Sequence, residues 1–168
     1  MKTAINKTTA LCLMLLLGLY FTSTVVAEDY KANYMAKKQQ NDATIGVIAG
    51  VINHVCPKLV PSSTNICNAK DPVGSAVGVQ KYMGQNWDQE EDDIEDADLP
   101  ELLHLDAALQ FWDAVEQFKM HFPYRKTASD LAAKAQWQDA FLNEEMAFQY
   151  LVKCASRGIF AQKMVDKQ

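Results

Sequence analysis

The sequence predicts an all-α protein, a small antiparallel bundle of four or five helices that follows a signal peptide and contains one disulfide. Three observations lead to this prediction. Apolar residues recur at helical spacing, prolines and glycines separate the helical stretches, and the first residues direct the chain to a compartment where disulfides persist. With 168 residues, the chain is long enough for one domain with a substantial core.

The first 27 residues have the three parts of a secretory signal peptide. Lys2 and Lys7 give a positive start, and residues 10–20 (ALCLMLLLGLY) form an apolar run. Residues 25–27 (VVA) then provide a cleavage site. A membrane span needs about 20 apolar residues, so this run is too short. We therefore expect cleavage after Ala27 and a periplasmic or secreted mature chain, with an uncleaved interfacial anchor as the alternative.

Negative charge is concentrated in one segment of the chain. The net charge is −5, and removal of a leader that carries two lysines changes it to −7. Residues 88–98 (DQEEDDIEDAD) contain eight acidic residues and no basic one. The rest of the mature chain is nearly neutral and has no basic stripe, which predicts that it binds neither nucleic acid nor an anionic membrane.

The predicted organisation is a signal peptide over 1–27, a polar lead segment over 28–40 and one helical domain over 41–168, with an acidic loop at 88–98. Asn41 or Asp42 would cap the first helix, and Pro57 would end it. A β-strand is the alternative there, because the apolar face is rich in β-branched residues: Ile45, Ile48, Val51, Ile52 and Val55.

The second helix has a clear start at Asp71 and Pro72, an aspartate in the cap position before a proline in the first helical position. It should cover residues 73–85. Its glycines at 74 and 78 repeat the spacing of those at 46 and 50 in the first helix. Two helices could cross closely through these glycines, with chance similarity as the alternative.

The third and fourth helices are predicted from wide apolar faces. The third should start at Asp98 and stop at Pro123, with so much apolar surface that neighbours should cover several of its sides. That surface contains Leu102, Leu105, Ala108, Leu109, Phe111, Trp112, Val115, Phe118 and Phe122. The fourth should run from Thr127 to a C-terminal cap at Gly158, followed by a short turn or a frayed tail.

Three cysteines remain in the mature chain. A disulfide between Cys56 and Cys67 would close a short loop and contribute about 3 kcal/mol, while Cys154 would be a buried free thiol. The alternatives are a bridge from Cys154 to either of the other two and an intermolecular disulfide.

Metal-binding patterns are incomplete in this sequence. His54 and the three cysteines are residue types that suit zinc, but their spacing matches no paired-ligand pattern. Glu101 and His104 match half of a di-iron motif whose second copy is absent. We therefore predict no metal and no cofactor.

Glu144 is the carboxylate with the most unusual predicted position, because helical projection places it between Phe141 and Phe148 on a core face. The first interpretation is a buried pair with a basic residue from another helix. The alternatives are a partly exposed position in a groove and a catalytic acid or base. No nucleophile motif accompanies Glu144, so the chain is predicted not to be an enzyme.

These observations predict a non-enzymatic protein-binding domain, such as an inhibitor or an immunity-type protein, although no family motif is present. The acidic loop would dock a basic partner surface. The predicted docking residues are Trp87, Asp88, Glu90, Glu91, Asp92, Asp93, Glu95, Asp96 and Asp98. A solvated linker and weak divalent-cation binding are the alternatives for this segment.

Two other functions remain open for the whole chain. One is a structural or accessory subunit of a cell-envelope assembly, which would pack through the paired glycines. The other is an enzyme or a metal or cofactor carrier with a site near Glu144, His54 or His104.

Overall fold

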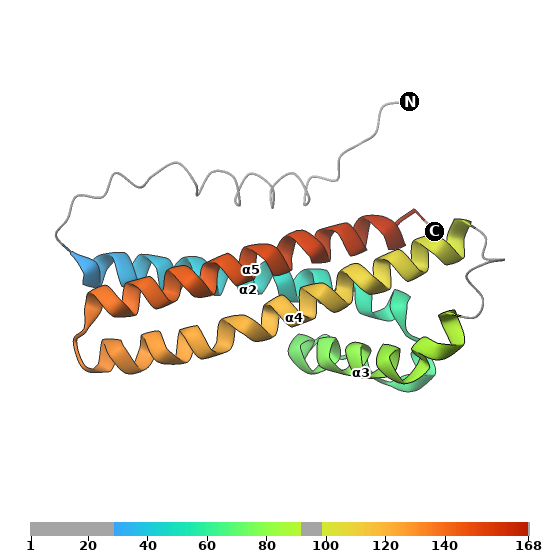
Figure 1. The fold of residues 1–168 in the computed structure, drawn as a ribbon, viewed down its shortest axis with the longest axis horizontal. Coiled ribbons are helices and arrows are strands. Elements are labelled where there is room, and N and C mark those ends of the chain that lie inside the picture. The colour runs from blue at the N-terminus through green and yellow to red at the C-terminus, as the bar shows by residue number, and fades with distance from the viewer. Residues whose placement is uncertain (1–28, 92–98, 168) are drawn as a thin grey trace, which may run out of the picture.

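The protein is a bundle of long helices (Figure 1). A computed structural model describes residues 29–91 and 99–167, and over these ranges it contains no β-strand. The elements are α2 (Tyr30–Leu59), the 3₁₀ turn η1 (Ser62–Thr64), α3 (Pro72–Glu91), α4 (Leu99–Ala133) and α5 (Trp137–Val165). The all-α bundle is confirmed, while the predicted signal peptide lies outside the described residues.

The helices α2 and α5 run in the same direction. Asn41 bonds Glu144 in the first part of each helix, and Lys58 pairs with Asp166 at the opposite end. Figure 1 shows α4 beside them, and α3 beside only one half of the bundle. The loop that precedes α3 returns along α2, where the side chain of Asn53 donates to the carbonyl of Ala69 at 3.4 Å.

Helix α4 runs antiparallel to α3 and to α5. Its side chains meet α3 in reverse order, because Gln80 bonds Glu116 while Gly84 lies against Trp112. A tight turn then reverses the chain into α5. Ala135 adopts a positive φ of 56°, and the N–H of Gln136 donates to the carbonyl of Leu131, five residues earlier.

Two prolines were predicted to end helices, and both predictions are wrong. Pro57 lies inside the end of α2, and Pro123 lies inside α4, which continues to Ala133. A proline within a helix removes one backbone hydrogen bond. Pro123 and Lys119, whose carbonyl loses its N–H partner, are both exposed, so water can bond that carbonyl.

Within the predicted polar lead over residues 28–40, residues 30–40 are helical. Helix α2 begins at Tyr30, and Asp29 caps it by accepting a hydrogen bond from the N–H of Ala32 at 3.1 Å. Asn41, predicted as a cap, is instead fully buried inside the helix, and Thr44 is also buried. Polar residues on the buried side interrupted the apolar period, and the sequence pattern therefore placed the helix start too late.

The predicted start of α3 is confirmed. The N–H of Gly74 donates to Asp71 Oδ1 at 2.8 Å, and the helix continues past Gln85 to Glu91. The predicted bounds of the last helix are wrong at both ends, because α5 starts at Trp137 and passes Gly158 to reach Val165.

The core has two parts of unequal size. The large one lies between all four helices, and its most buried members include Val55, Cys56, Val79, Phe111, Leu151 and Ala161. It defines the wide half of the molecule: α3 with residues 45–59, 99–118 and 147–165. The small part contains Tyr34, Ala128 and Ala140. It defines the narrow half: residues 30–44, 121–133 and 137–146.

The predicted covering of α4 on several sides is incomplete, because Leu102, Leu109 and Phe122 are exposed. The glycine crossing is also not observed. A β-carbon on Gly46 or Gly50 would meet no atom within 4 Å. Among the described helices, none combines the length and the apolar character that a membrane span requires.

Candidate functional site

The predicted docking residues divide into two groups. The first group ends α3 and comprises Trp87, Asp88, Glu90 and Glu91. The second group lies outside the described residues and comprises Asp92, Asp93, Glu95, Asp96 and Asp98. The last turn of α3 contains no basic residue. Because the C-terminal end of a helix carries partial negative charge, each acid there destabilises the helix by about 0.3–1 kcal/mol.

The predicted disulfide is present. Cys56 at the end of α2 is bonded to Cys67 in the loop before α3, with 5.8 Å between their Cα atoms. Cys154 is a buried free thiol, and burial raises its pKa to about 12. It therefore stays protonated and unreactive at neutral pH. A stable disulfide is compatible with a location outside the cytosol.

A buried polar network joins three helices in the narrow half. The side chain of Asn41 donates to the backbone carbonyl of Glu144 at 2.9 Å and to Glu144 Oε2 at 2.5 Å. Arg125 Nε lies 3.3 Å from the same oxygen, and Arg125 Nη1 lies 2.8 Å from Asp42 Oδ1. Glu144 is only 1% exposed, so the first interpretation made from sequence, a buried pair, describes its surroundings.

This network affects neighbouring groups. Burial and the negative charge of Glu144 raise the pKa of Tyr34, which keeps its hydroxyl neutral. The Oδ1 atom of Asn41 is buried without a hydrogen-bond partner. Removing Arg125 would leave Glu144 without a countercharge, and breaking a buried pair in this way costs about 3–5 kcal/mol. The contacts of Glu144 therefore hold α2, α4 and α5 together.

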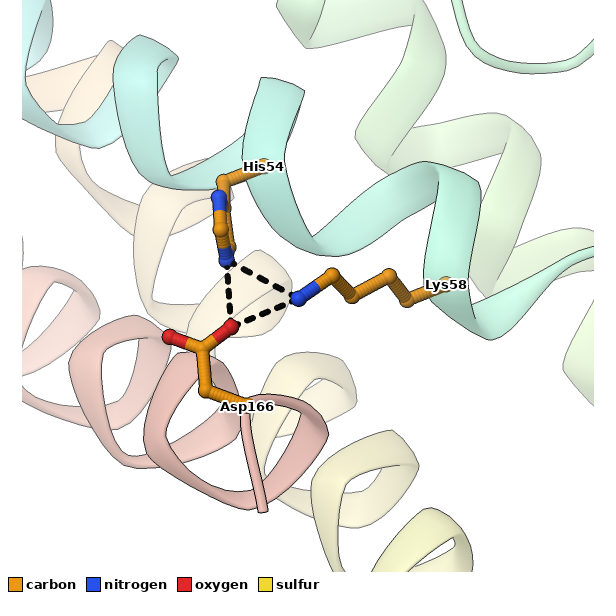
Figure 2. A network of polar contacts seen from close by, with 3 residues as sticks. All are labelled: His54, Lys58 and Asp166. Carbon is orange, nitrogen blue, oxygen red and sulfur yellow. Dashed lines mark hydrogen bonds and ion pairs between the residues drawn. The ribbon is translucent and has the colours of Figure 1, made fainter. Parts of the chain in front are cut away.

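A second polar cluster joins the ends of α2 and α5 (Figure 2). Asp166 Oδ1 lies 2.7 Å from His54 Nε2 and 2.6 Å from Lys58 Nζ, and the two nitrogens are 3.2 Å apart. Partial burial acts to raise the pKa of Asp166, but the hydrogen bonds from Lys58 and His54 outweigh it and lower that pKa.

The position of this cluster explains its composition. Asp166 is the C-cap residue of α5, where a negative charge is unfavourable, and two basic side chains offset it. All three side chains are partly exposed, so the ion pair between Lys58 and Asp166 contributes at most about 1 kcal/mol. The cluster therefore links the C-terminal end of α2 to the C-terminal end of α5.

The residue types that suit zinc, His54 and the three cysteines, do not come together in one site. Cys56 and Cys67 are in a disulfide, while His54 bonds Asp166. Over the described ranges, no group of three or more His, Cys, Asp or Glu side chains is placed to hold a metal ion.

His121 is a buried titratable residue that the sequence analysis did not single out. Its Nδ1 bonds the carbonyl of Phe118, and its ring packs against Phe118 and Phe122, with centroids 4.6 Å and 4.1 Å away. Burial lowers the pKa of His121, so the ring is neutral at neutral pH. The available signal was a histidine three residues after one phenylalanine and directly before another.

Polar contacts also fix α4 against both of its neighbours. Glu116 accepts hydrogen bonds from Gln80 of α3 at 2.5 Å and from Lys119 at 3.1 Å, and these bonds lower the pKa of Glu116. On the other side of α4, Arg157 of α5 pairs with Asp113 at 2.8 Å. These contacts hold α3 and α5 on opposite flanks of α4.

Comparison with known proteins gives no relative: no family model, no curated protein and no solved structure matches this chain.

Proposed function

We propose that this chain is an exported, non-enzymatic protein-binding domain of the inhibitor or immunity type. It docks a basic partner surface through the acidic end of α3 and the acidic residues that follow, within 88–98. The observation that carries the proposal is the last turn of α3, which has acids and no basic residue at the negative end of the helix. A cationic partner relieves that unfavourable charge.

Exposed apolar residues lie in the N-terminal half of α3, about 16–22 Å along the helix from its acidic end. Val73 and Val77 are one helical turn apart and both are exposed. Helix α3 packs through Ala76 and Val79, which are buried in the core, while Val73 and Val77 are outside that core. A partner that spans the length of α3 contacts both its acidic end and these two valines.

The charge of the segment determines how the partner associates. Eight acids within 11 residues attract a basic surface over a distance of about one Debye length, ~8–10 Å at moderate salt. Such steering raises the association rate and fixes orientation more than it adds affinity. Binding should therefore weaken as the salt concentration rises.

A matched pair of variants tests the proposal. The first replaces Asp92, Asp93 and Asp96 by asparagine, and the control replaces Asp130 and Asp139 by asparagine and Glu145 by glutamine. Each is immobilised and exposed to a cell-envelope extract at ~50 mM and ~300 mM salt.

We expect one protein to be captured at low salt by the unmodified chain and by the control, and to be lost from the first variant. The same protein should be released at high salt. Equal capture by both variants, or capture that does not respond to salt, contradicts the proposal.

A second candidate function is a structural or accessory subunit of an envelope assembly. The open space around Gly46 and Gly50 favours it, because a neighbouring helix could approach the α2 backbone closely there. Gly74 and Gly78 face Asp71 and Ile66 of the same chain instead. Light scattering distinguishes the two functions: a stable large oligomer supports the subunit, and a small species argues against it.

The absence of enzymatic activity stays a prediction. The alternative, an enzyme or a metal or cofactor carrier near Glu144, His54 or His104, has a direct test. Metal analysis and an absorption spectrum of the purified protein should show neither a stoichiometric metal nor a chromophore.

A further inference from the structure

The α4–α5 pair has an outer face on the side that is turned away from α2. Helix α5 meets α2 through Glu144 and Gly158, and different side chains of α5 project outward. In Figure 1, α4 and α5 cross in front of α2. Helical spacing puts exposed large apolar residues of both helices on this face: Leu102, Leu109 and Met120 from α4, and Met146 and Phe160 from α5.

Charge on the outer face is segregated by helix. Between residues 102 and 120, the charged residues of α4 are the acidic Asp106, Asp113 and Glu116 and one basic residue, Lys119, which pairs with Glu116 at 3.1 Å. Between residues 146 and 164, those of α5 are Lys153, Arg157 and Lys163, all basic. The face therefore has one flank with a net negative charge, on α4, and one with a net positive charge, on α5.

The two flanks lie side by side at the same level along the bundle. Arg157 reaches across to Asp113 at 2.8 Å and to Gln110 at 3.0 Å. Further along the same seam, the rings of Tyr124 and Tyr150 stack with their centroids 5.5 Å apart. These contacts show which residues of α4 and α5 lie at the same position along the bundle axis.

We propose that the outer face binds the outer face of a second copy of this chain, with α4 of each copy lying on α5 of the other. A two-fold axis parallel to the helices produces this arrangement and keeps each residue at its own level. The acidic flank of one copy then faces the basic flank of the other, and the Asp113–Arg157 pair of each chain meets the same pair of the second copy with opposite charges facing each other.

The same charges disfavour the other symmetric arrangement. A two-fold axis in the interface but perpendicular to the helices stacks α4 on α4 and α5 on α5. Acid then faces acid and base faces base, which is repulsive. Of the two face-to-face dimers, charge complementarity therefore selects the one that pairs α4 with α5.

Apolar contacts supply the centre of this interface. Leu109 and Phe160 lie near the level of the Asp113–Arg157 pair, so Leu109 of one copy meets Phe160 of the other. Lys163 lies over the ring of Phe160, with Nζ 5.6 Å from the centroid, and would border the contact. Exposed apolar residues bordered by complementary charges are the usual composition of an interface.

Sedimentation of the mature chain tests the dimer, with two variants matched in exposure. Phe160 on the outer face is 52% exposed, and Met35 on α2 is 55% exposed, so neither substitution by serine should disturb the core. We expect a dimer that Phe160→Ser weakens about tenfold or more and Met35→Ser leaves unchanged. A monomer at ~100 μM, or equal effects of both variants, overturns the proposal.

Cysteine cross-linking tests the orientation. Leu109→Cys and Phe160→Cys proteins are oxidised separately and as a mixture, with the buried Cys154 left in place. We expect a disulfide-linked dimer in the mixture and little in either protein alone. Cross-linking of Leu109→Cys to itself, with none in the mixture, contradicts the pairing of α4 with α5. The outer face shares no helix with the docking surface proposed on α3, so each proposal can fail without the other.

Discussion

The wide and narrow halves are built from the same long helices but are stabilised by different interactions. In the wide half, four helices surround a large apolar core, and the Cys56–Cys67 disulfide ties α3 to α2. In the narrow half, three helices surround Tyr34, Ala128, Ala140 and a buried polar network. The wide half should therefore depend on apolar area, and the narrow half on the pairing of a few polar atoms.

The largest expected effect is loss of apolar packing in the wide half. Phe111 is 1% exposed in the middle of the large core, and Phe111→Ala should lower the free energy of unfolding by about 3–5 kcal/mol. Chemical denaturation followed by circular dichroism measures this. Leu142→Ala is the control, because Leu142 is exposed and its replacement should change stability little. Similar losses for both variants would contradict the assignment of the core.

The next effect is loss of the countercharge in the narrow half. Arg125→Met leaves Glu144 buried and unpaired, and it should lower the free energy of unfolding by about 3 kcal/mol, somewhat below Phe111→Ala because Arg125 is partly exposed.

The double variant Arg125→Met with Glu144→Leu removes both charges. It should recover part of the lost stability, because no unpaired charge remains. If the double variant is less stable than Arg125→Met alone, Glu144 does not need the pairing that the network gives it.

Two helical glycines should respond to alanine in opposite directions. A β-carbon on Gly158 would lie 2.9 Å from Val51 Cγ1, so Gly158→Ala should destabilise the protein by about 1–3 kcal/mol. Gly50 has open space around it, and Gly50→Ala should stabilise by about 0.5–1 kcal/mol. Thermal denaturation of both variants measures the pair, and a change of the same sign in both contradicts the close approach of α2 and α5.

The smallest effect is a dependence of stability on pH through His121. Burial lowers its pKa in the folded state, so below about pH 6.5 the unfolded chain binds a proton that the folded chain does not. Stability from this group is therefore present above pH 6.5 and is lost as the pH falls. Denaturation between about pH 7 and 5 should show a smaller loss for His121→Asn, in which an amide replaces Nδ1. An unchanged pH slope would show that His121 does not contribute.

The comparison also explains which features sequence could predict. The disulfide and the start of α3 depend on local signals, a short loop between cysteines and an Asp-Pro cap, and both are confirmed. The first part of α2 was missed because its buried side includes Asn41 and Thr44. The turn at Ala135 was missed because an alanine has the positive φ that usually indicates glycine.

In the candidate site, too, local features were predictable from sequence, and contacts between distant residues were not. Helical projection was sufficient to predict that Glu144 is buried, but its partners Asn41 and Arg125 come from two other helices. The contact between His54 and Asp166 joins residues 112 positions apart, which no local pattern indicates. Sequence therefore identified individual residues of interest, and the packing of the helices determined their partners.

Native-state hydrogen exchange tests the contrast between the two halves most directly. Because its apolar core is small, the narrow half should open at a lower free energy than the wide half. We expect the amides of residues 30–44 and 121–133 to exchange through this partial opening, while those of 48–56 and 147–158 exchange only on global unfolding. Equal protection in the two halves, or greater protection in the narrow one, would contradict the account.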